Sequence, residues 1–181
     1  MNTGIMFLQQ LINGLSLGSI YALIALGYTM VYGIVKLINF AHGDIMMIGA
    51  YTAYFVLKAF GTNVLGMAAA FVIAMIVCGL LSIVIERFAY RPLRSAPRLN
   101  SLITAIGVEL ILQNAMRVLP FVGPDPRQFP TFAVKTFNAG LVTISNIQLI
   151  VIILSALLMF ALNYIVNYTK TGKAMQAVSY D

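Results

Sequence analysis

The sequence predicts an all-α integral membrane protein, a bundle of about five transmembrane helices. Of its 181 residues, 61% are hydrophobic and 9% are charged, and the mean hydropathy is +0.94, whereas about a quarter of the residues in a soluble domain are charged. The apolar runs are long enough to cross a hydrocarbon core of about 30 Å. They lack the alternation of polar and apolar residues that a barrel strand shows, so helices are the expected form.

The apolar residues fall into successive segments that we expect to be the helices. The first has no Lys or Arg before it and no small-residue cleavage pattern, so it is expected to be a retained span and not a signal peptide. The segments are Ile5 to Val35, Ile45 to Phe60, Val64 to Ile85, Leu102 to Leu119 and Ile147 to Val166.

Basic residues in the loops predict the orientation of the chain. The loop "ERFAYRPLRSAPR" and the tail after Val166 are expected on the cytoplasmic side, because their basic residues are Arg87, Arg91, Arg94, Arg98, Lys170 and Lys173. Residues 120–146 then lie outside, and one crossing per segment puts the N-terminus outside too. A first segment that partly returned, or a re-entrant second segment, would move the N-terminus. The net charge of +6 is explained by loop residues that face the cytoplasm and anionic lipid. Nucleic acid is therefore not an expected partner.

Small residues form a row on one face of the first segment. Gly14, Gly18 and Ala22 recur every four residues, which places them above one another on a helix. Such a row allows two helix backbones to approach closely inside lipid, so we expect this face to pack against other spans.

The outer loop begins with "PFVGPDPRQFP", whose four prolines exclude regular helix. After it, "TFAVKTF" and "LVTIS" flank "NAG", a weak signal for a β-hairpin. The loop could dock an external partner, but a connector held off the membrane by its prolines is the favoured interpretation.

Polar residues interrupt the apolar sequence at "INFAHGDIM", residues 38–46, where Asn39, His42 and Asp44 surround Gly43. Ionisable groups at hydrocarbon depth normally face a cavity, a water path or a partner, and a broken helix there could line a substrate path. The alternative is a cytoplasmic turn between two spans, with Asp44 favouring the positive N-terminus of the next helix. The residues alone leave both interpretations open.

A second polar group lies inside "ITAIGVELILQNAM". Glu109 is followed at i+4 by Gln113 and one turn later by Arg117, so the three share a helix face. This stripe could line a path or make hydrogen bonds between helices. We expect Asp44 and Glu109 to face protein or water and not lipid tails.

Enzyme chemistry is not expected from these residues. The chain has no metal-spaced His or Cys pair, and its single cysteine, Cys78, is expected to be a small packing residue. "YTKTGKAM" lacks the first glycine and the Ser or Thr of a P-loop, so the chain is not expected to hydrolyse ATP. No metal or other cofactor is predicted.

The stretch "NGLSLGSIYALIALGYTMVYGIVKLINFAHGDIMMIGAY" resembles the N-terminal part of LivH-type permeases, the membrane subunits of ABC importers for branched-chain amino acids. The likeness continues through "IERFAYRPLRS", "SLITAIGVELILQNAMR" and "TKTGKAMQAVSYD", and so covers nearly the whole chain. The N-F-A-H-G stretch and the E-R-x-A-Y-R-P-L-R loop are far more specific than hydropathy.

The resemblance implies a multi-pass subunit of the bacterial inner membrane, one permease domain over residues 1–181. Its implied partners are a second, LivM-like permease, two cytoplasmic ATPase subunits, a periplasmic binding protein and membrane lipid. In related sugar permeases the segment matching residues 38–43 is an interrupted helix start near the translocation path, which favours a path role there. Residues expected to receive force from the ATPase are Thr171, Gly172, Lys173 and Ala174.

The resemblance leaves the cargo open. Leucine, isoleucine and valine are favoured, but similar permeases carry urea and short amides. A proton-coupled carrier using His42, Asp44 and Glu109 is one competing hypothesis, and a scaffold without transport activity is a second. LivH-type permeases continue past the point matching Asp181 with further spans, so we expect this chain to be a fragment or a shortened product that ends near the start of the coupling segment.

Overall fold

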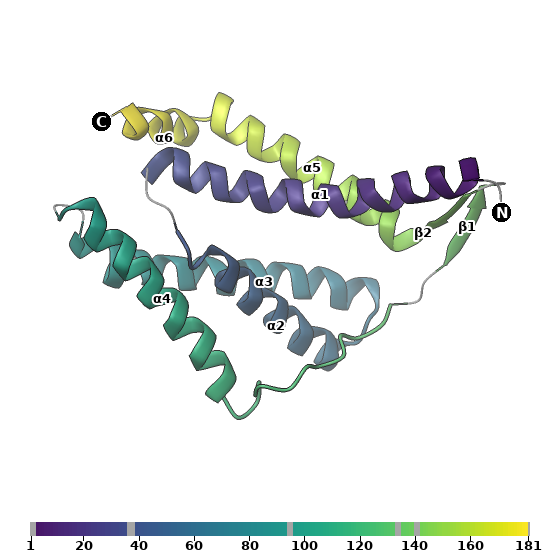
Figure 1. Cartoon of the computed structure of the whole chain (residues 1–181), viewed down its shortest axis with the longest axis horizontal. Helices are drawn as coiled ribbons and strands as arrows, with labels where there is room; N and C mark the ends of the chain where they lie inside the picture. Colours follow the sequence, from purple (N-terminus) through teal and green to yellow (C-terminus); the bar gives the residue numbers. More distant parts are fainter. Residues whose placement is uncertain (1–2, 36–38, 94–95, 133–134, 140–141, 181) are drawn as a thin grey trace. The chain divides into compact units, whose positions relative to one another are not determined.

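The computed structural model describes residues 3–35, 39–93, 96–132, 135–139 and 142–180, most of them helical (Figure 1). The chain divides into two compact units. The first contains Met1–Lys36 and Ala133–Asp181, and the second is Leu37–Phe132. Whether both act as one permease domain stays a prediction.

In the first unit, helix α1 (Thr3–Val35) pairs with α5 (Asn146–Tyr168) (Figure 1). The short helix α6 (Lys170–Tyr180) contacts both. Helix α1 has 33 residues without interruption, about 50 Å at 1.5 Å per residue. An uninterrupted helix does not turn back, and this one is longer than the hydrocarbon core, so spanning it requires tilt or a projecting end.

A hairpin in the first unit confirms the weak signal in the outer loop. Strand β1 (Thr136–Ala139) pairs antiparallel with β2 (Val142–Ser145), with Thr136 opposite Ser145. The glycine of the quoted "NAG", at position 140, lies outside the described residues. Ser145 also begins α5: its hydroxyl accepts from the Ile147 amide at 3.2 Å, while the Gln148 side chain accepts from the Ser145 amide at 3.0 Å. This capping box starts the helix directly at the end of the strand.

The second unit contains the other three long helices. These are α2 (His42–Phe60), α3 (Val64–Ile85) and α4 (Arg98–Val118). Helix α3 continues into a π-helical turn, η1 (Glu86–Tyr90), and a 3₁₀ turn, η2 (Arg91–Leu93). The helical path thus changes its winding where the apolar sequence gives way to the basic loop.

Helices α2 and α3 form a close antiparallel pair. Gly61 turns the chain with a φ of 81°, a left-handed value that favours glycine, and Asn63 caps α3 by accepting from the Gly66 amide at 2.7 Å. Farther along the pair, the thiol of Cys78 donates to the Ile45 carbonyl at 3.4 Å. A Cβ added to Gly49 would lie 2.8 Å from the Cys78 sulfur. Cys78 is therefore a small packing residue, as predicted.

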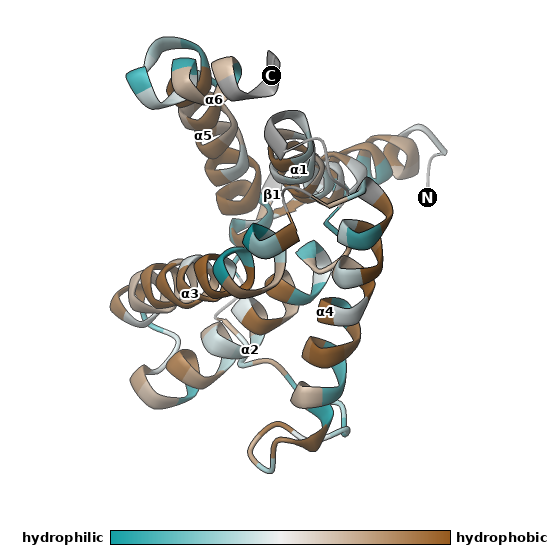
Figure 2. Cartoon of the chain, turned by 90° about the vertical axis from the view of Figure 1, so that its left-hand side faces the viewer, coloured by the Kyte–Doolittle hydropathy of each residue, from teal (hydrophilic) through white to brown (hydrophobic). Residues whose placement is uncertain are grey.

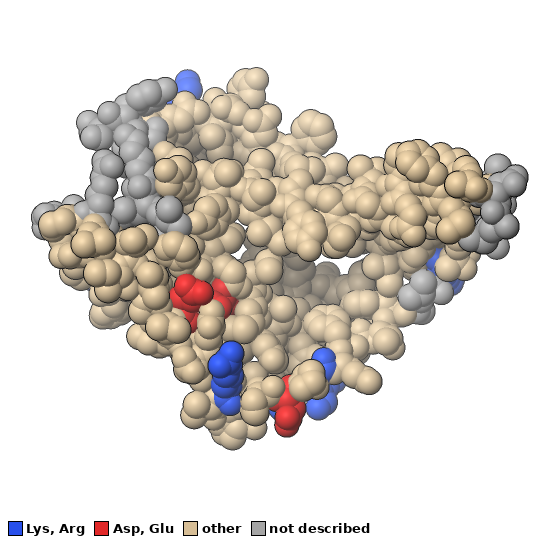
Figure 3. Space-filling view, viewed as in Figure 1, with Lys and Arg blue, Asp and Glu red and all other residues tan. Residues whose placement is uncertain are grey.

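Within the described residues, four helical segments are long and apolar enough to cross a membrane: Thr3–Gly33, Val64–Leu93, Leu99–Val118 and Asn146–Tyr168. Helix α2 is not among them because its composition is more polar, although its 19 residues would span about 28 Å. Figure 2 shows apolar residues along α3 and α5, with hydrophilic ones on α6. The face drawn in Figure 3 carries few charged groups. The chain is a multi-pass, all-α membrane protein.

The proline-rich segment after α4 has no regular helix over residues 119–132, as its prolines predict. It packs on α2 and so does more than connect two spans. Phe121 lies 6.1 Å from Phe55, and Phe129 lies 6.3 Å from Tyr54, between ring centres. Val122 is 2% exposed, so the segment contributes a small core of its own.

Candidate functional site

The polar stretch at residues 38–46 lies where α2 begins. Helix α1 ends at Val35, residues 36–38 lie outside the described part, and α2 starts at His42. The predicted interruption near residues 38–44 therefore coincides with a junction between two helices. This placement agrees with the interpretation of the stretch as a turn between spans.

Asn39 ties this junction to the end of α3. The Tyr90 hydroxyl donates to the Asn39 Oδ1 at 3.0 Å, and the His42 amide donates to the Asn39 carbonyl at 3.2 Å. Tyr90 belongs to η1, the wider turn with which the basic loop begins. Sequence reasoning missed Tyr90 as a partner. The sequence signal for it was that Tyr90 lies in the E-R-F-A-Y-R loop, one of the stretches that carry the family resemblance.

Asp44 is buried and lies in the first turn of α2. Its exposed fraction is 8%, and among the described residues its Oδ2 has no hydrogen-bond partner. The positive end of the α2 dipole favours a carboxylate at this position. Of the neighbouring candidates, His42 is half-buried, whereas Gly43 is exposed with open space beside it.

Glu109 and Gln113 share one face of α4, as their spacing predicts, and bond to each other. The Gln113 Nε2 donates to the Glu109 Oε1 at 3.2 Å on α4, and both side chains are half-buried. Arg117, the third residue of the stripe, is exposed in the last turn of α4. The polar groups thus occupy two places in the second unit, one at the start of α2 and one along α4.

The small-residue row on α1 is open in this chain. Gly14, Gly18 and Ala22 are exposed, and a Cβ added at Gly14 or Gly18 would meet nothing within 4 Å. Its packing against another span stays a prediction.

The corner between α5 and α6 contains the residues implied in coupling. The Thr169 hydroxyl accepts from the Gly172 amide at 3.1 Å and so caps α6. Gly172 is buried, and a Cβ there would overlap the carbonyl oxygens of Ile165 and Val166. The other three candidates are exposed: Thr171, Lys173 and Ala174.

A polar network at the opposite end of the first unit was not predicted. The Gln9 side chain accepts from the Thr143 amide and donates to the Thr143 carbonyl, both at 2.9 Å. Asn13 accepts from Gln148 at 2.9 Å and from Gln9 at 3.3 Å. Its bonds from α1 to Thr143 and Gln148 join residues 134 and 135 positions apart along the chain, so no local pattern could have revealed it.

Within the described residues, no cluster of three or more His, Cys, Asp or Glu side chains could hold a metal ion.

Comparison with known proteins assigns the chain to a family. Residues 10–181 match the family described as branched-chain amino acid transport system / permease component. The chain is 42% identical to the high-affinity branched-chain amino acid transport system permease protein BraD of Pseudomonas aeruginosa, over 97% of this chain and 60% of that protein. It is 40% identical to the corresponding LivH proteins of Salmonella typhimurium and Escherichia coli K12, over 97% of this chain and 59% of each.

The chain therefore spans about three-fifths of the length of these curated relatives. No solved structure matches it. With nearly the whole chain covered by the family match and four helices of spanning length in its described part, the chain belongs to the permease components of branched-chain amino acid transport systems.

Proposed function

We propose that this chain forms part of the membrane pathway of an ATP-driven importer for branched-chain amino acids. The observation that carries the proposal is the family match over residues 10–181, together with relatives whose names state high-affinity branched-chain amino acid transport. In this role the chain breaks no chemical bond. It lines one half of a path that opens alternately to the two sides of the bacterial inner membrane.

The proposed assembly contains a second, LivM-like permease, two cytoplasmic ATPase subunits and a periplasmic binding protein. The α5–α6 corner is the proposed contact for the ATPase, because Thr171, Lys173 and Ala174 are exposed there. Gly172 lets α6 fold tightly against the end of α5. A movement of the ATPase would thus be passed to a spanning helix.

The proposed path residues are the two polar groups of the second unit, Asn39, His42, Gly43 and Asp44 at the start of α2 and Glu109 with Gln113 on α4. Burial of Asp44 and the Glu109–Gln113 hydrogen bond support a position facing protein or water, since a carboxylate in lipid tails would be costly. Asp44→Asn and Glu109→Gln should reduce uptake while the assembly still forms. Asp125→Asn, in the exposed loop, is the matched control and should not reduce uptake.

Uptake by the assembly tests the function. Residues 1–181, with any sequence that follows them in the gene product, would be expressed with the second permease, the ATPases and the binding protein in cells lacking their own branched-chain systems. Radiolabelled leucine uptake would then be measured in vesicles. Uptake that survives an uncoupler but stops on ATP depletion supports the proposal. The opposite response would identify a proton-coupled carrier, and uptake of urea or acetamide in place of leucine would change the cargo.

A further inference from the structure

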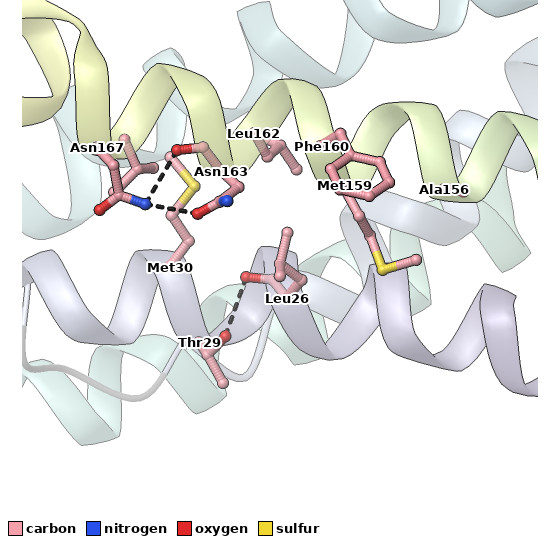
Figure 4. Close-up of a pocket in the computed structure, with 10 residues that line it drawn as sticks. Leu26, Thr29, Met30, Ala156, Met159, Phe160, Leu162, Asn163 and Asn167 are labelled. Atoms are coloured by element: carbon pink, nitrogen blue, oxygen red, sulfur yellow. Dashed lines mark hydrogen bonds between the residues drawn. The ribbon is translucent and has the colours of Figure 1, made fainter.

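A groove runs between α1 and α5 in the first unit. It has a volume of about 510 Å³ and is lined mostly by apolar side chains, among them Leu26 and Met30 from α1 and Ala156, Met159 and Phe160 from α5 (Figure 4). Phe160 is 75% exposed. An apolar groove of this kind on a spanning helix pair is open to an occupant from outside the unit.

The groove has the length of one membrane leaflet. Its lining on α5 extends from Ala156 to Asn167, about 16 Å at 1.5 Å per residue. Half of a hydrocarbon core of about 30 Å is about 15 Å. The groove can therefore accept an extended acyl chain that enters from one face of the bilayer.

The end of the groove near α6 is polar. Asn163 and Asn167 are exposed there, and the Asn167 Nδ2 donates to the Asn163 carbonyl oxygen at 3.1 Å (Figure 4). Helix α6 folds back over this end, since the Gln176 side chain donates to the Val166 carbonyl at 3.2 Å. The groove thus changes from apolar to polar along its length, as a phospholipid does.

Positive charge follows the polar end along the chain, three and six residues after Asn167. Lys170 and Lys173 are exposed on the first turns of α6, and the described residues of this unit include no Asp or Glu. Two lysines near the bilayer surface attract anionic headgroups, which are enriched in the cytoplasmic leaflet. The charge of the site is therefore complementary to a phosphate-bearing anionic lipid.

We propose that the α1–α5 groove binds an anionic phospholipid, with one acyl chain against Met159 and Phe160 and the headgroup beside Lys170 and Lys173. The lipid would join a spanning helix to α6 on the side from which the ATPase is proposed to act. The inference does not depend on the transported cargo.

Photo-crosslinking in membranes tests the site. Phosphatidylglycerol and phosphatidylcholine carrying the same diazirine-labelled acyl chain would be incorporated in membranes that hold the assembled transporter, and labelled peptides mapped by mass spectrometry. Phosphatidylglycerol should label α5 around Met159 and Phe160 more strongly than phosphatidylcholine does. Lys170→Gln and Lys173→Gln should each weaken this labelling about fivefold. Lys135→Gln, at the other end of the unit, is the charge-matched control.

A groove-filling variant tests the contact with the acyl chain separately from the contact with the headgroup. Ala156→Phe should reduce labelling of α5 by both lipids, because the side chain would occupy the apolar end of the groove. Equal labelling by the two lipids in the unmodified chain would overturn the proposal. Absence of labelling on α5 by either lipid in the assembled transporter would overturn it as well, by showing that lipid does not enter this groove.

Discussion

Single glycines decide how closely the helices of this chain approach one another. At Gly172, a methyl group would overlap two backbone carbonyl oxygens, which cannot rotate away as a side chain can. We expect Gly172→Ala to lower the free energy of unfolding by about 1–3 kcal/mol, the usual cost of overpacking. The measurement is thermal or denaturant unfolding in detergent.

Gly18→Ala provides the control for that change. A Cβ at Gly18 meets nothing within 4 Å, and alanine is the better helix former by about 1 kcal/mol. This variant should be as stable as the unmodified chain or more so. If the two variants lost equal stability, the close α5–α6 corner would not exist in solution.

The contact between Gly49 and Cys78 gives a second prediction at this scale. A methyl group at Gly49 would come within 2.8 Å of the sulfur, and moving the thiol would break its 3.4 Å hydrogen bond to the Ile45 carbonyl. Gly49→Ala should lower the melting temperature, and adding Cys78→Ala should restore most of the loss. The double-mutant cycle should give a coupling of about 0.5–3 kcal/mol, whereas strict additivity would show that the two residues are not in contact.

Some contacts of single residues could be predicted from the sequence, and others could not. The shared face of Glu109 and Gln113 follows from the helical period, but their hydrogen bond lies within α4 and not between helices. The bond from Tyr90 to Asn39 joins residues 51 positions apart, and it depends on where the end of α3 meets the start of α2. Gly172 could be associated with coupling by resemblance, but its close approach to α5 is a fact of tertiary structure.

At the scale of elements, the hairpin is held to the membrane helices by side-chain amides. The Gln9 side chain makes hydrogen bonds with both the amide and the carbonyl of Thr143, as the backbone of a neighbouring strand would. Gln9→Glu removes the donor and places a carboxylate beside the Thr143 carbonyl. With each hydrogen bond contributing about 0.5–1.5 kcal/mol, the hairpin should open more often, and its amides should exchange roughly tenfold faster.

Hydrogen–deuterium exchange over residues 136–145 measures this opening. Gln10→Glu is the matched control, because Gln10 is the exposed neighbour on the same helix and its substitution introduces the same charge. Exchange that rises equally in both variants would attribute the effect to charge alone. Exchange unchanged in Gln9→Glu would show that the hairpin is held by other contacts.

The positions of the helices were predictable because a span in lipid requires a long, mostly apolar run of residues, and such runs are visible in the sequence. Each long helix lies within a few residues of an apolar segment, and α3 has the bounds expected, Val64–Ile85. Helix α2 begins at His42, three residues before its apolar segment, since helix formation at a junction does not require apolar residues. The packing of the proline-rich segment on α2 was not predictable, because prolines exclude helix without indicating a contact.

At the scale of the whole molecule, charge is distributed unequally along the chain. Four of the eleven basic residues lie from Arg87 to Arg98, in the segment that joins α3 to α4 and at the first residue of α4. Basic residues in short loops resist translocation more strongly than acidic ones. The segment is therefore expected on the cytoplasmic side, and the loop after α4, with Asp125 and Arg127, on the opposite side.

Cysteine labelling in whole cells tests this orientation. In a Cys78→Ala background, which removes the single native thiol, one cysteine would replace Arg91 and another, in a separate variant, Asp125; both positions are exposed. A membrane-impermeant maleimide added from outside should label position 125 in intact cells and position 91 only after permeabilisation. Helix α4 is a single apolar span between the two positions, so they must lie on opposite sides if it crosses. Labelling of position 91 alone would reverse the orientation, and labelling of both in intact cells would show that α4 does not cross the membrane.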